Sequence, residues 1–156
     1  MEQHERLITE FYTAFARRDP VGMAACYHAD VAFSDPVFVD LRGDRAGAMW
    51  EMLCLRGKDL KVEFRDVQAD EQKGKAHWDA WYTFSATGRT VRNSIDATFE
   101  FADGMIIKHN DSFAFRAWAS QALGLPGKLF GGFPFLQNKV RATALKGLDD
   151  HIARRG

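Results

Sequence analysis

The sequence predicts an α+β domain, in which N-terminal helices pack on a cone-like, curved antiparallel sheet and a C-terminal helical extension follows. Three observations predict this class. Apolar residues recur at helical spacing in the first third of the chain, period-two alternation takes over from about residue 60, and short turn signals separate the alternating stretches. Helices followed by sequential hairpins are typical of α+β folds rather than of parallel α/β folds.

Apolar residues at helical spacing predict three helices in the N-terminal part, over about residues 2–17, 20–27 and 43–55. Asp19 and Pro20 begin the second helix, since aspartate is a favoured N-cap and proline a favoured first helical residue. Residues 29–34 form a short strand. It ends at Asp35-Pro36, because proline cannot donate a hydrogen bond to a sheet ladder.

Four longer strands are predicted over residues 60–69, 75–86, 90–101 and 105–116. Thr87-Gly88 and the loop at 102–104 are turn signals, and strands joined by such short turns pair antiparallel. A glycine-rich stretch precedes a last helix over about residues 135–153. We expect residues 1–118 to form the main domain and residues 119–156 to form a C-terminal helical extension of the same domain.

The hairpins indicate which strand residues share a face, because side chains alternate along a strand. A two-residue first turn pairs Tyr82 with Asn93, and a three-residue second loop places Ile95 opposite Asp111. The shared face is strongly apolar and should meet the helices, yet it also carries His109. An imidazole and a carboxylate are costly to bury unpaired, so they either form a structural network or line a wet pocket. A histidine beside a carboxylate can also transfer protons.

Two stretches resemble a known superfamily: YHADVAFSDPV at residues 27–37 and FEFADGMIIKHND at residues 99–111. Together with the order of elements, they resemble the nuclear transport factor 2-like superfamily over residues 2 to about 118. The chain looks closest to the branches of ketosteroid isomerases and SnoaL-like polyketide cyclases. The resemblance implies a pocket for a hydrophobic small molecule, and it allows an isomerase or lyase activity. This fold also hosts binders and transport factors, so fold alone does not define activity.

The resemblance also implies candidate catalytic residues. Ketosteroid isomerases use an aspartate base, with a tyrosine and a protonated aspartate as the oxyanion hole. Asp35 matches the base and Tyr12 matches the tyrosine. Asp96 matches the third group by local sequence, but the hairpin register places it on the outer face. His109 and Asp111 look more like the cyclase pattern, in which a histidine and an aspartate handle protons. Asp35 as a turn residue and Tyr12 as a core residue remain alternatives.

The wall of the expected pocket contains aromatic residues and one amide, namely Trp50, Trp78, Tyr82, Asn93 and Phe113. A non-catalytic binder of a hydrophobic molecule and a protein-interaction domain are the alternatives to an enzyme. Arg42 and Arg45 raise an epoxide-hydrolase alternative, although no arginine lies on the inner face of the predicted strands. The polar outer face of the sheet suits solvent or a homodimer interface.

Composition excludes several classes. Lys plus Arg and Asp plus Glu balance at 21 each, so we expect no nucleic-acid partner and no membrane contact. No cluster of ligands has metal spacing, and no cofactor motif appears, so we expect neither a metal nor a cofactor. Cys26 and Cys54 suit free thiols. The N-terminus has no signal-peptide pattern, and the cytoplasm is the expected location.

Overall fold

The computed structural model describes residues 2–155 and confirms the α+β class. The chain forms six helices and six strands in this part: α1 (Gln3–Ala16), α2 (Pro20–Ala24), β1 (Tyr27–Ser34), β2 (Leu41–Arg42), α3 (Asp44–Arg56), β3 (Lys61–Ala69), β4 (Lys73–Phe84), β5 (Arg89–Ala102), β6 (Met105–Ser112), α4 (Phe115–Leu123), α5 (Leu125–Phe130) and α6 (Pro134–Arg155).

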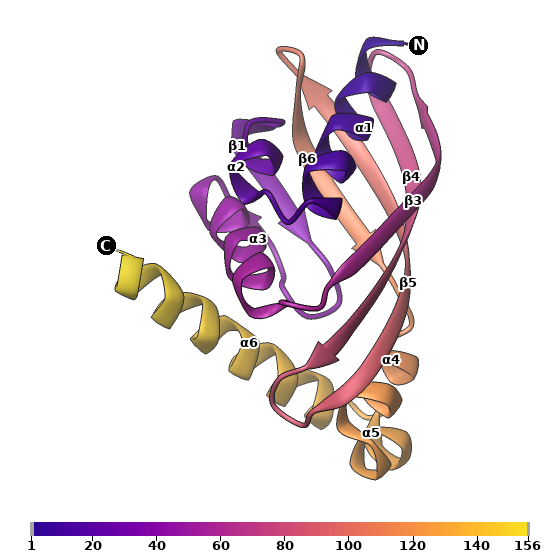
Figure 1. Cartoon of the computed structure of the whole chain (residues 1–156), viewed down its shortest axis with the longest axis vertical. Coiled ribbons are helices and arrows are strands. Elements are labelled where there is room, and N and C mark those ends of the chain that lie inside the picture. The colour runs from indigo at the N-terminus through magenta and orange to yellow at the C-terminus, as the bar shows by residue number, and fades with distance from the viewer. Residues whose placement is uncertain (1, 156) are drawn as a thin grey trace.

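The strands form one curved sheet in the order β2-β1-β6-β5-β4-β3. β3 to β6 pair antiparallel as sequential hairpins, as predicted. β1 departs from the all-antiparallel expectation, because it pairs parallel with β6. Figure 1 shows α1 and α3 against the inside of the curve, with α4 against the beginning of β5, α5 packed on α4, and α6 running back alongside α3.

The β4–β5 hairpin has a longer turn than predicted. Residues 85–88 form a four-residue turn, so Tyr82 pairs with Val91 and Ala80 pairs with Asn93. The predicted pairing of Tyr82 with Asn93 is wrong by two residues. A shift of two leaves every side chain on its predicted face, because the side-chain period of a strand is two.

The β5–β6 hairpin is tighter than predicted. Asp103 and Gly104 form a two-residue turn with φ of +54° and +75°, the positive values that this kind of hairpin turn requires. A register shift follows immediately, and Ile107 is the unpaired extra residue. As a result Ile106 is wholly buried, and Ile107, which we expected to point inward, is only half-buried.

Because of this register shift, the β6 residues beyond it lie on the faces of the sheet that the sequence predicts. His109 pairs with Phe99 and Asp111 pairs with Ala97, so both polar residues lie on the buried face. Asp96 lies outside, with 81% of its side chain exposed. The prediction that Asp96 leaves the inner face is therefore confirmed.

The chain after β6 differs most from expectation. β6 ends at Ser112 instead of continuing to residue 116, and α4 begins three residues later. The short α5 was not predicted, because glycines and a proline break its pattern. A Cβ on Gly127 would overlap the carbonyl of Ala119, so α5 packs backbone to backbone on α4.

Two apolar clusters fill the domain. The larger lies between α1, α3 and the sheet and surrounds His109, and the smaller lies between β5 and α4 around Trp118. Three half-buried residues, Val37, Tyr82 and Phe113, contact both clusters. The junction between the clusters is thus lined by apolar side chains that are not fully covered.

Candidate functional site

A chain of hydrogen-bonded side chains crosses the larger cluster. The Trp50 indole donates to the Tyr27 hydroxyl at 2.8 Å, and that oxygen lies 2.8 Å from His109 Nδ1. His109 Nε2 lies 2.9 Å from Asp111 Oδ1, to which the Trp78 indole also donates at 3.4 Å. α3, β1, β4 and β6 each contribute to this network, which satisfies polar groups that would otherwise be costly to bury.

One proton arrangement satisfies every atom of this network. The indole N–H of Trp50 can only donate, so the Tyr27 oxygen accepts from it and directs its own O–H to His109 Nδ1. His109 is then the neutral tautomer with its proton on Nε2, which donates to the Asp111 carboxylate. Burial raises the pKa of Tyr27 well above its ordinary value, which keeps the donating proton in place.

Aromatic rings enclose His109 completely. Its exposed fraction is 0%, and its ring centroid lies 4.5 Å from that of Phe99, 5.0 Å from Phe33 and 5.4 Å from Phe11. No ligand can touch this imidazole while these rings hold their places. In this geometry the imidazole contacts Tyr27 and Asp111 and does not reach the surface.

Asp35 occupies a different environment at the end of β1. It is half-buried, and its Oδ1 accepts hydrogen bonds from the backbone N–H groups of Val37 at 2.7 Å and Phe38 at 2.6 Å. The pKa of Asp35 rises from 3.8 to about 7, mainly because of burial and partly because of the negative charge of Asp111, while those two hydrogen bonds lower it. A carboxyl with a pKa near neutrality can take up and release a proton at physiological pH.

The C-terminal helix contributes to the surroundings of Asp35. Arg141 on α6 donates from Nε to the carbonyl oxygen of Pro36 at 2.9 Å, and its charge opposes the rise in the pKa of Asp35. On another side lies Tyr82, whose pKa is raised by burial and by the charge of Asp35. Trp118 of α4 donates to the Tyr82 hydroxyl at 2.7 Å.

Tyr12 is the third candidate acid-base group. Its side chain is wholly buried among Phe64, Trp78 and Phe99. Among residues 2–155, its hydroxyl is the single buried side-chain polar atom without a hydrogen-bond partner. Burial and the charge of Asp111 raise its pKa well above the ordinary value, so the hydroxyl holds its proton. It is an unused donor inside the larger apolar cluster.

The predicted wall residues separate into two groups. Trp50 and Trp78 are buried and belong to the hydrogen-bonded network. Tyr82, Asn93 and Phe113 are half-buried, and both Tyr82 and Phe113 lie at the junction of the two apolar clusters. Residues able to meet a ligand from outside therefore lie on the side of Asp35.

Two surface hollows lie elsewhere. One of about 550 Å³ lies on the outer face of the sheet and includes Lys75, Thr98 and Asn110, and one of about 340 Å³ includes Trp81 and Arg92. Neither is lined by His109, Asp111 or Asp35. The expected pocket around His109 is not among these hollows, because aromatic rings occupy that space.

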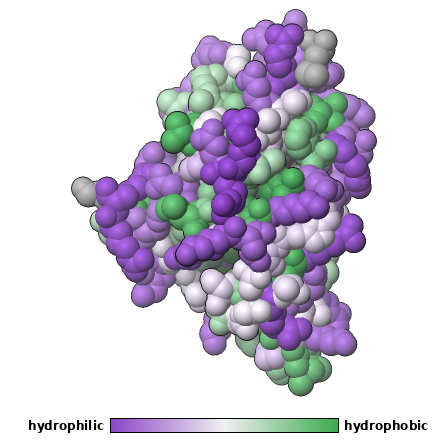
Figure 2. Space-filling view, viewed as in Figure 1, coloured by the Kyte–Doolittle hydropathy of each residue, from purple (hydrophilic) through white to green (hydrophobic). Residues whose placement is uncertain are grey.

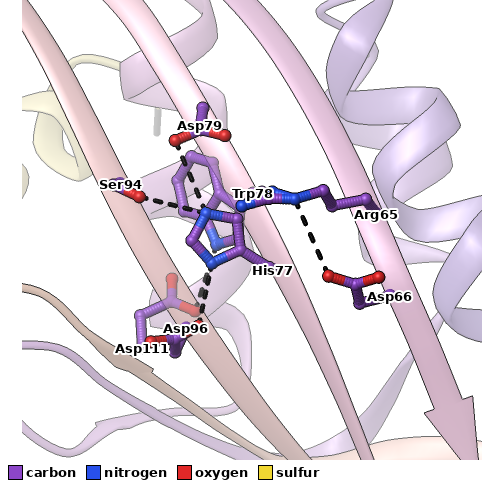
Figure 3. A network of polar contacts seen from close by, with 8 residues as sticks. All are labelled: Arg65, Asp66, His77, Trp78, Asp79, Ser94, Asp96 and Asp111. Atoms are coloured by element: carbon purple, nitrogen blue, oxygen red, sulfur yellow. Dashed lines mark hydrogen bonds and ion pairs between the residues drawn. The ribbon is translucent and has the colours of Figure 1, made fainter.

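The outer face carries a second polar cluster (Figure 3). His77 Nδ1 lies 2.8 Å from Asp96 Oδ1, and its Nε2 lies 3.0 Å from the Ser94 hydroxyl and 3.5 Å from Asp79. Two carboxylates and a hydroxyl thus share one imidazole on a strand face. Asp96 is engaged here, on the opposite side of the sheet from Tyr12.

The arginines that suggested an epoxide hydrolase point away from the site. Arg42 pairs with Asp40 at 2.8 Å, and Arg45 pairs with Asp149 of α6 at 2.9 Å, with all four side chains at least 41% exposed. They hold surface elements together rather than facing Asp35.

Sequence reasoning missed Tyr27, Trp118 and Arg141. Tyr27 was placed at the end of the second helix, and only the parallel pairing of β1 with β6 brings it to His109. Trp118 and Arg141 lie on helices after the sheet, whose position no hairpin register determines. Tyr27 does begin the first of the two stretches that carry the family resemblance, and this is the one signal in the sequence that points to it.

Fold and site together define a SnoaL-like α+β cone with buried acid-base groups. The model of the SnoaL-like domain family matches residues 8–109, and the chain belongs to this family. No curated protein matches the chain.

Solved structures share the fold at low sequence identity. A candidate polyketide cyclase from Xanthomonas campestris pv. campestris is 21% identical with a TM-score of 0.64, and the match covers 76% of this chain and 96% of that one. TerC, co-crystallised with polyporic acid, is 17% identical with a TM-score of 0.65 over 77% and 98% of the two chains. An LEH-like epoxide hydrolase from M. tuberculosis is 18% identical with a TM-score of 0.62, over 83% and 97%.

Proposed function

We propose that this protein is an isomerase, cyclase or dehydratase that moves a proton at a carbon next to a carbonyl group in a hydrophobic small molecule. The SnoaL-like family and the cyclase-like neighbours support this class of activity. The observation that carries the proposal is the half-buried Asp35 carboxyl, which two backbone N–H groups hold in place and whose pKa burial raises to about 7. The wholly buried Tyr12 hydroxyl, which has no partner among residues 2–155, is the proposed hydrogen-bond donor, and a substrate carbonyl oxygen that displaces the rings around it would satisfy this hydroxyl.

Asp35 is the proposed base. Its carboxylate takes the proton from the α-carbon, and the electron pair of that C–H bond moves to the carbonyl oxygen to give an enolate. Tyr12 donates a hydrogen bond to this oxygen as its charge develops. Asp35 then returns the proton to another carbon in an isomerisation. In a cyclisation the enolate carbon attacks a second carbonyl carbon, the C=O electron pair moves to that oxygen, and the resulting alkoxide takes the proton from Asp35. A base with a pKa near 7 suits both proton uptake and proton release.

Asp111 and His109 are proposed as positioning residues. The network from Trp50 to Asp111 holds the carboxylate in one orientation, and its charge acts on both Asp35 and Tyr12. Substrate would enter at the junction of the apolar clusters, where Val37, Tyr82 and Phe113 are half-buried. We also propose that the protein forms a homodimer through the polar outer face of the sheet.

Proton exchange tests the proposal without knowledge of the natural substrate. The protein is incubated in D₂O with a panel of β,γ-unsaturated cyclic ketones, and deuterium at the α-carbon is followed by proton NMR. We expect exchange with at least one ketone, and a loss of roughly 10²- to 10⁴-fold in Asp35→Asn. Exchange that is equal in wild type and Asp35→Asn would contradict the assignment of the base.

The competing function is a non-catalytic binder of a hydrophobic molecule. The complete burial of His109 favours it, because the imidazole on the inner face of the sheet is beyond the reach of a ligand. A binder would take up a ketone of the panel saturably, show no exchange, and bind equally after Asp35→Asn.

A further inference from the structure

The far end of the molecule from α1 carries a cluster of exposed apolar side chains. Nine large hydrophobic residues are exposed in the described part of the chain, and five of them lie within eleven residues, namely Leu125, Leu129, Phe130, Phe133 and Phe135. The other four are scattered over separate elements. Figure 2 shows hydrophobic surface at the end of the molecule where Figure 1 places α5. Exposed patches of this kind mark interaction sites.

These side chains form one surface, which we call the apolar tip. The ring centroids of Phe130, Phe133 and Phe135 lie 5.7 to 6.2 Å from one another. The tip is held by close backbone packing, because Gly127 lets α5 approach Ala119 of α4 without a side chain between them. The rings therefore project from α5, which is packed closely on α4, and from the beginning of α6.

Charge along this part of the chain is one-sided. No acidic residue occurs between Asp111 and Asp149, whereas five basic residues do: Arg116, Lys128, Lys139, Arg141 and Lys146. Lys128 lies on α5 itself, Lys139 lies one helical turn beyond Phe135, and the Arg116 side chain packs beside Gly131. Arg141 turns inward to Pro36, so the exposed cations nearest the tip are Arg116, Lys128 and Lys139.

We infer that the apolar tip docks on an anionic lipid surface. Phenylalanine and leucine side chains flanked by lysine and arginine match a bilayer in both respects, since the rings enter the boundary of the acyl chains and the cations meet anionic headgroups. A second copy of the chain is the poorer partner, because two tips face to face would bring like charges together without an acidic residue between them. The described helices include none that is long and apolar enough to cross a bilayer, so the contact is peripheral.

This contact is independent of the proposed catalysis, and its test uses no substrate. It departs from the expectation of no membrane contact, which rested on the balanced charge of the whole chain. Although the charges of the whole chain balance, every charged residue between residues 112 and 148 is positive, and this segment also carries the exposed rings.

Vesicle flotation tests the inference. The full chain is mixed with vesicles of phosphatidylcholine alone or with one third phosphatidylglycerol, and the bound fraction is measured at low and high salt. We expect binding to the anionic vesicles only, weakened by salt. Phe133→Ser with Phe135→Ser should reduce the partition coefficient at least about tenfold, and Lys128→Glu with Lys139→Glu should reduce it by a similar factor.

Val21→Ser and Lys58→Glu are matched controls, since Val21 is 78% exposed on α2 and Lys58 is exposed beyond α3. They should bind as wild type does, and circular dichroism should show every variant folded. Failure to float with anionic vesicles, or binding that ignores the two phenylalanine substitutions, would overturn the inference. So would a concentration-dependent dimer that those substitutions abolish, because the tip would then be an interface between copies.

Discussion

Asp35→Asn is expected to stabilise the protein in a pH-dependent way. Burial raises the folded-state pKa of Asp35 from 3.8 to about 7, so the folded protein favours the protonated carboxyl. The unfolded chain releases this proton near its ordinary pKa. The contribution of Asp35 to the stability of the folded state is therefore most favourable below pH 3.8, becomes less favourable as pH rises between 3.8 and 7, and stays at its least favourable above 7.

The magnitude follows from the size of that shift. A shift of one pKa unit corresponds to 1.36 kcal/mol, so ionised Asp35 costs at most roughly 4 kcal/mol at pH 8 and less than half of that at pH 5. Asparagine has the same shape and no charge, and its Oδ1 can still accept from the backbone N–H groups of Val37 and Phe38. The gain from Asp35→Asn should thus be larger at pH 8 than at pH 5 by roughly 2 to 3 kcal/mol.

Urea unfolding followed by circular dichroism at pH 5, 6, 7 and 8 measures the difference. Asp30→Asn is the control, because it removes an exposed carboxyl of the same strand. The reasoning is refuted if Asp35→Asn destabilises the protein at pH 8, or if its effect relative to Asp30→Asn does not change with pH. Loss of activity together with a gain in stability would be the signature of a strained functional group.

Three other outcomes are expected. Tyr27→Phe should lower the free energy of unfolding by roughly 2 to 4 kcal/mol, because the Trp50 indole and the His109 ring lose their shared partner. Tyr12→Phe should be neutral or stabilising in the same urea titration, because the hydroxyl that it removes has no partner. The same Tyr12→Phe variant should exchange ketone protons about 10²- to 10³-fold more slowly, and unchanged exchange would remove Tyr12 from the mechanism. The logarithm of kcat/KM should rise with pH to a plateau above about 7, and Arg141→Gln should move that rise to higher pH, because the arginine charge lowers the pKa of Asp35. An unchanged pH profile of kcat/KM in Arg141→Gln would show that Arg141 of α6 does not influence the catalytic site.

Several features could be read from the sequence because they depend on local periodicity. The predicted β4–β5 pairs were wrong by two residues, and the β5–β6 pairs were wrong by one residue before the bulge and by two beyond it, where the faces were right. A register error of an even number of residues leaves each side chain on its predicted face of the sheet. His109 and Asp111 were therefore placed correctly on the inner face and Asp96 on the outer face. The capping of α2 by Asp19 was likewise local, and the Asp19 carboxylate accepts from the Gly22 amide at 3.0 Å.

Other features depend on contacts between distant parts of the chain. Tyr27 contacts His109, 82 residues away in the sequence, through a parallel strand pairing that has no turn signal in the sequence. Arg141 contacts Pro36, 105 residues away, from a helix that follows the sheet. Periodicity placed His109 on the inner face but could not say that aromatic rings fill the space around it. That distinction matters for the proposed mechanism, because Asp35 is half-buried and can meet a ligand at the surface, whereas a ligand reaches His109 or Tyr12 only when the surrounding rings move. Packing density is a property of all the side chains together, and only the tertiary structure determines it.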